Sequence, residues 1–107
     1  MRVLFIGCVK SSYVLMDELL KNNINIVGVV TKKISRLNSD FADLSPLCNE
    51  YNVDIHYTKD ARDEETYKFI KNKKPDLIYC FGWSHILSIE IINIPSTLAS
   101  AFKSSEF

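Results

Sequence analysis

Residues 7–12 are the first group that could bind a ligand. Gly7, Lys10, Ser11 and Ser12 follow directly on the apolar run Val3–Ile6. Backbone N–H groups, hydroxyls and an ammonium at the start of a helix suit a phosphate or a sugar hydroxyl. The segment matches neither G-x-G-x-x-G nor G-K-[ST], so NAD binding and a P-loop are not supported. A capped turn with an exposed lysine is the alternative, and the residues alone leave both open.

A second candidate segment, residues 81–87, follows the apolar run 77–81. The exposed backbone of a glycine–tryptophan turn could bond a flat heterocycle that neighbouring apolar side chains cover. Alternatively, the tryptophan only roofs the core. His85 alone is interpreted as a surface residue, and His56 is given no role. The residues predicted to contact a ligand here are Gly82, Trp83, Ser84, Ile86 and Leu87.

The remaining reactive side chains do not assemble into a catalytic or metal site. Cys8, Cys48 and Cys80 form no C-x-x-C pair, so zinc and dithiol chemistry are not supported, and we expect no metal. An odd number of cysteines argues against a disulfide framework. The opening apolar run is too short for a signal peptide, and no stretch is long enough to span a bilayer. These features predict a cytoplasmic protein without a membrane partner.

The charge balance gives no general attraction to nucleic acid. Lysine plus arginine and aspartate plus glutamate both number 13, so the net charge is zero and DNA is not an expected partner. Low net charge also gives little repulsion between copies, which favours a homodimer. Lys71, Lys73 and Lys74 are interpreted as a solvated helix end rather than a phosphate-binding patch.

Strand-like and helix-like segments alternate along the chain. Strands are expected at residues 3–6, 25–30, 53–57 and 77–81, with a weak fifth at 98–102. Four helices are expected. The first begins after a cap at Ser11 or Ser12 and ends at Asn22–Asn23, and the second begins after a cap at Ser45, with Pro46 in its first turn. The third extends from the acids 63–65 to the lysines 71–74, and the fourth from Ser84 to Pro95. This order predicts an α/β, Rossmann-like, doubly wound, mainly parallel sheet of four to five strands in three αβα layers. Ligands of such sheets bind beyond the carboxyl ends of the strands, where both candidate segments lie.

Three stretches resemble the N-terminal domain of the formyltransferase family, which includes methionyl-tRNA, glycinamide ribonucleotide and sugar-nucleotide formyltransferases. They are M-R-V-L-F-I-G at residues 1–7, N-K-K-P-D-L-I at 72–78 and F-G-W-S-H-I-L-S-I-E-I-I at 81–92. The last is most similar to the sugar-nucleotide branch. The resemblance covers residues 1–95 as an incomplete formyltransferase-like α/β domain and leaves 96–107 as a divergent tail.

The resemblance implies a reaction and a division of the site. Such enzymes transfer the formyl group of N10-formyltetrahydrofolate to a substrate amine, here expected to be a small molecule such as a nucleotide-linked amino sugar. The loop of Gly82 to Leu87 would border the folate. Gly7, Lys10, Ser11 and Ser12 would face the amine-bearing substrate. In the family an Asn and a His stabilise the oxyanion, and an Asp assists proton transfer.

The chain departs from the family where these catalytic groups are expected. Ala101 and Lys103 stand at the approximate positions of the Asn and the His, and the Asp has no counterpart. Lysine differs from histidine in shape and charge, and loss of the oxyanion donors costs about a thousandfold in rate. We therefore expect the chain alone to be inactive, as the C-terminally truncated product of a shortened or frame-shifted gene rather than a short relative retained for binding. Two other functions stay open: a non-catalytic nucleotide- or small-molecule-binding module, and an interaction domain that pairs through an exposed sheet edge.

Overall fold

The computed structural model describes residues 1–33, 40–58 and 64–80. In this part of the chain, strands and helices alternate in seven elements. They are β1 (Val3–Ile6), α1 (Lys10–Lys21), β2 (Ile26–Thr31), α2 (Ser45–Tyr51), β3 (Ile55–Tyr57), α3 (Glu64–Lys73) and β4 (Leu77–Cys80).

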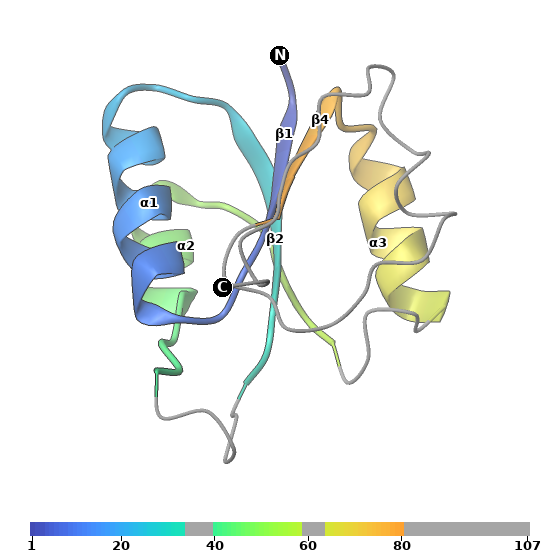
Figure 1. Ribbon diagram of the computed structural model, residues 1–107. Coiled ribbons are helices and arrows are strands. Elements are labelled where there is room, and N and C mark those ends of the chain that lie inside the picture. The colour runs from blue at the N-terminus through green and yellow to red at the C-terminus, as the bar shows by residue number, and fades with distance from the viewer. Residues whose placement is uncertain (34–39, 59–63, 81–107) are drawn as a thin grey trace.

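The four strands form one parallel sheet in the order β3-β2-β1-β4. Helices α1 and α2 cover one face and α3 covers the other, which gives three layers (Figure 1). The predicted α/β, Rossmann-like, parallel fold is therefore confirmed. The expected fifth strand and the helix from Ser84 to Pro95 lie outside the described residues.

The alternation of side chains along β1 divides the core between the two faces of the sheet. Leu4 and Ile6 join the cluster under α3, whereas Val3 and Phe5 join the cluster under α1 and α2. All four residues are buried, as expected for a central parallel strand with both faces covered. Ile70 of α3 completes the first cluster, and the second is completed from the two helices by Met16, Leu20, Leu47 and Cys48.

Helix α1 begins one or two residues before the predicted caps. Its N-cap is Val9, which has extended backbone and forms an isolated antiparallel bridge with Phe41. Ser12 is the third helical residue, and its hydroxyl accepts a hydrogen bond from the Val9 N–H at 3.3 Å. The prediction that Ser11 or Ser12 occupies the cap position was wrong, because backbone pairing fixes Val9 there. The helix ends at Lys21 with Asn22 as C-cap, as predicted.

Helix α2 also begins with a different cap from the one predicted. Leu44 is the N-cap residue, and Ser45 is already helical. The backbone N–H of Ser45, the first helical residue, donates to Asp43 Oδ1 at 2.9 Å, so this N–H at the start of the helix is satisfied by the aspartate. The prediction that Ser45 caps the helix was wrong. Pro46 lies in the first turn, as predicted, where its missing N–H costs nothing.

Helix α3 follows the predicted charge pattern, with Glu64 and Glu65 in its first turn and Lys71 and Lys73 in its last. It packs closely on β2 at Gly28. A Cβ at Gly28 would lie 3.1 Å from Phe69 Cζ, so glycine permits the close approach of helix and sheet. Strand β3 is shorter than the predicted 53–57, because its pairing is limited to 55–57. Strand β4 spans Leu77–Cys80 as predicted, and residue 81, the last residue expected in it, lies outside the described residues.

Candidate functional site

The strand order reverses at β1. This strand pairs with β2 on one side and with β4 on the other, and its last residue, Ile6, is the register partner of Cys80 at the end of β4. The segments that follow Ile6 and Cys80 thus leave the sheet from neighbouring points on the same edge. Crevices at such a reversal are the usual ligand sites of open parallel sheets.

Backbone donors in the loop after β1 are largely committed to bonds within the chain. Gly7 N–H donates to the Val30 carbonyl at 3.2 Å, and Lys10 N–H donates to the Asp40 carbonyl at 2.9 Å. The Val9 N–H is held by Ser12, as described above. A ligand would therefore meet the side chains of this loop more than its backbone.

The four predicted substrate-facing residues of this loop are in different environments. Lys10 and Ser11 are exposed in the first turn of α1, so an ammonium and a hydroxyl project at the edge of the sheet. Ser12 is buried and bonded to Val9, and Gly7 is buried beside β2. A ligand could therefore contact Lys10 and Ser11, whereas Gly7 and Ser12 stabilise the loop.

Residues 40–42 form a strap over this loop that the sequence did not reveal. The Ala42 N–H donates to the Cys8 carbonyl at 2.9 Å, and Phe41 bridges Val9 in antiparallel fashion. With the bond to Asp40, three consecutive residues are tied to the loop after β1. No periodicity or turn motif in the sequence marks this pairing, because it joins two segments about thirty residues apart.

Cys8, in the loop after β1, is buried in the cluster under α3. Burial raises the pKa of its thiol, and the nearby Lys32 ammonium opposes that rise only in part. The thiol is therefore neutral at physiological pH and is not an activated nucleophile.

The predicted folate-facing residues Gly82, Trp83, Ser84, Ile86 and Leu87 lie outside the described residues, as do His85, Ala101 and Lys103. The structure gives the point from which their segment starts, directly after Cys80 and next to Ile6. That point lies at the carboxyl ends of the strands, where the sequence analysis predicts ligand binding.

His56, to which no role was assigned, belongs to a network that joins β3 to α3. Its Nε2 lies 3.1 Å from Thr66 Oγ1, and its ring stacks on Phe69 with a centroid distance of 5.1 Å. The Thr66 hydroxyl in turn donates to Thr58 Oγ1 at 2.7 Å. The network explains His56 as a residue that holds the edge strand against the helix.

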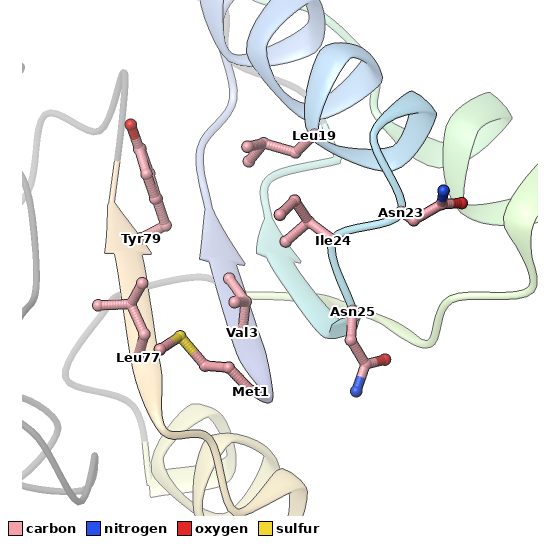
Figure 2. A pocket seen from close by; sticks show the side chains of 8 residues that line it. All are labelled: Met1, Val3, Leu19, Asn23, Ile24, Asn25, Leu77 and Tyr79. Atoms are coloured by element: carbon pink, nitrogen blue, oxygen red, sulfur yellow. The ribbon is translucent and has the colours of Figure 1, made fainter.

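An apolar recess of about 350 Å³ lies at the other end of the sheet, between the end of α1 and the amino ends of β1 and β4. In Figure 2 its apolar side chains gather around the opening, while the amides of Asn23 and Asn25 point away from it. It is separate from the edge described above. Its lining residues are Met1, Val3, Leu19, Asn23, Ile24, Asn25, Leu77 and Tyr79.

Within the described ranges, no cluster of three or more histidine, cysteine or carboxylate side chains is arranged to hold a metal ion. The same ranges contain no helix with the length and apolarity needed to cross a bilayer.

An α/β domain of this order, with its candidate site at the reversal of the sheet, is a framework shared by many enzymes. No family model matches the chain. It is 28% identical over 99 residues to a methionyl-tRNA formyltransferase of Clostridioides difficile (strain 630). The matched segment covers 89% of this chain and 32% of that protein. The methionyl-tRNA formyltransferase of Thermotoga sp. (strain RQ2) is 25% identical over 100 residues, covering 90% and 32% respectively.

The chain is thus distantly similar to the N-terminal part of methionyl-tRNA formyltransferases, which confirms the resemblance seen in the sequence. A third such enzyme, from Thermotoga maritima, is 23% identical over 100 residues. The chain spans about a third of the length of these curated relatives. The domain boundary at residue 95 stays a prediction.

Proposed function

We propose that this chain is the N-terminal part of a folate-dependent formyltransferase of the cytoplasm. The whole enzyme would move the formyl group of N10-formyltetrahydrofolate to the amine of an amino-sugar nucleotide. The proposal is carried by one observation: a similarity to formyltransferases that extends over about 90% of the chain. The sheet order supports it, because both candidate segments begin at the same edge.

The folate would be held by the segment after β4. An indole such as that of Trp83 offers a flat apolar surface to a pteridine ring, and the backbone of Gly82 and Ser84 offers donors and acceptors to the polar edge of that ring. Ile86 and Leu87 would cover the ring from the apolar side. This assignment is based on the resemblance and on the position of Cys80, from which the segment starts.

The amine-bearing substrate would lie against the start of α1. Lys10 and Ser11 are exposed there, at the positive end of a helix of 12 residues, where a diphosphate is electrostatically favoured. Gly7 and Ser12 would act indirectly, because they shape the loop through their bonds to Val30 and Val9. The similarity of residues 81–92 to the sugar-nucleotide branch is the reason for proposing a sugar nucleotide, whereas the curated relatives are named for methionyl-tRNA.

We further propose that the chain binds its ligands without transferring the formyl group. Ala101 and Lys103 stand at the approximate positions at which the resemblance places the oxyanion-stabilising Asn and His. An alanine donates no hydrogen bond, and an ammonium on a long flexible stem does not reproduce an imidazole. The expected loss is about a thousandfold in rate.

Calorimetric titration with a stable analogue of N10-formyltetrahydrofolate tests the folate assignment. We expect saturable binding that weakens by about tenfold or more in Trp83→Ala, given the usual contribution of a stacked aromatic side chain. Val14→Ala is the matched control, because Val14 is 67% exposed on α1. Binding that is absent, or equal in both variants, would contradict the proposal.

Titration with UDP-glucosamine tests the second half of the site, with methionyl-tRNA as the competing probe. Lys10→Ala should weaken binding of the sugar nucleotide, while Lys21→Ala, at the other end of the same helix, should not. Tighter binding of methionyl-tRNA would replace the sugar nucleotide as the proposed substrate. With N10-formyltetrahydrofolate added as donor, formation of an N-formyl product and tetrahydrofolate by the chain alone would refute only the proposed loss of catalysis.

A further inference from the structure

No further inference is drawn: the strongest candidate, the apolar recess of about 350 Å³ between the end of α1 and the amino ends of β1 and β4, carries nothing because no feature of the described part of the chain shows what covers it.

Discussion

Ile6 and Cys80 are register partners at the carboxyl ends of two adjacent parallel strands. They are far apart in the sequence, yet this pairing brings the segments on both sides of the candidate site to one edge of the sheet. A donor and an acceptor bound to these two segments would meet there. The proposed binding of a folate beside an amine-bearing substrate requires that the segments after Ile6 and Cys80 start next to each other.

Arg2 helps to keep β4 beside β1. Its guanidinium donates to the Lys73 carbonyl from Nε at 2.9 Å and from Nη2 at 2.6 Å, and its backbone N–H donates to Asp76 Oδ2 at 2.8 Å. We expect Arg2→Ala to lower the free energy of unfolding by about 1 kcal/mol, because the last carbonyls of α3 lose their side-chain donor. Lys21→Ala, which removes only an exposed pair with Asp17, is the control for urea denaturation. Equal stability of Arg2→Ala and wild type would show that the hydrogen bonds from the Arg2 guanidinium to the end of α3 do not contribute to stability.

Two buried threonines should respond in opposite ways to replacement by valine. Thr31 Oγ1 has no hydrogen-bond partner among the described residues, so Thr31→Val should leave stability unchanged or raise it by up to about 1 kcal/mol. Thr66→Val should cost about 1–3 kcal/mol, because it breaks the network with Thr58 and His56. Thermal unfolding of the two variants measures both effects. If Thr31→Val were the more destabilising variant, the hydrogen-bond assignment would be wrong.

The close approach of α3 to the sheet predicts a cost for any side chain at Gly28. Gly28→Ala would place a Cβ 3.1–3.2 Å from atoms of Phe69 and Lys73. The Phe69 ring would have to shift by a few tenths of an ångström against its stacking on His56, so we expect a destabilisation of about 1 kcal/mol. In a Phe69→Leu background the same substitution should cost less, since the ring that it meets is gone. A double-mutant cycle from urea denaturation measures the difference. Additive effects of the two substitutions would contradict the proposed contact.

Cys48 should be protected from alkylation in the folded chain. Burial, with a smaller contribution from Asp43, raises the pKa of its thiol to about 11. Because the folded-state pKa lies above the unfolded value of 9.0, the neutral thiol favours the folded state below pH 9, and this contribution is lost as the pH rises from 9 to 11.

At pH 8 we therefore expect iodoacetamide to modify Cys48 about a hundredfold more slowly than free cysteine, with the half-buried Cys80 modified before it. Peptide mapping by mass spectrometry separates the sites, and urea-unfolded protein supplies the control. Rapid modification of Cys48 under native conditions would contradict its burial in the cluster between α1, α2 and the sheet.

The fold was predictable because the strands and helices that build it are marked by short, contiguous patterns in the sequence. The apolar runs at β1 and β2, the acids at the start of α3 and the lysines at its end each appear as a contiguous signal. The alternation of these elements then indicates a parallel sheet. The burial of Leu4 and Ile6 follows from the continuous apolar run of a strand covered on both faces.

The starts of α1 and α2 and the strap of residues 40–42 were not predictable from local sequence patterns. Val9 caps α1 because it pairs with Phe41, and Leu44 is the N-cap of α2, with Asp43 accepting from the Ser45 N–H. The first interaction is long-range, and the second places an apolar residue at a position for which serine and aspartate are the usual choices. No local pattern marks residues 40–42 as a pairing segment, although their backbone ties down the loop after β1.

Fluorescence of Trp83 tests the central claim most directly, because it is the only tryptophan in the chain and it lies in the segment that leaves β4. Titration with the folate analogue should change the emission saturably, and the change should match the binding curve obtained by calorimetry. Tyrosine-only emission from Trp83→Phe supplies the background. If the analogue binds without altering Trp83 emission, the folate lies elsewhere; if it does not bind, the kinship with formyltransferases does not extend to their cofactor.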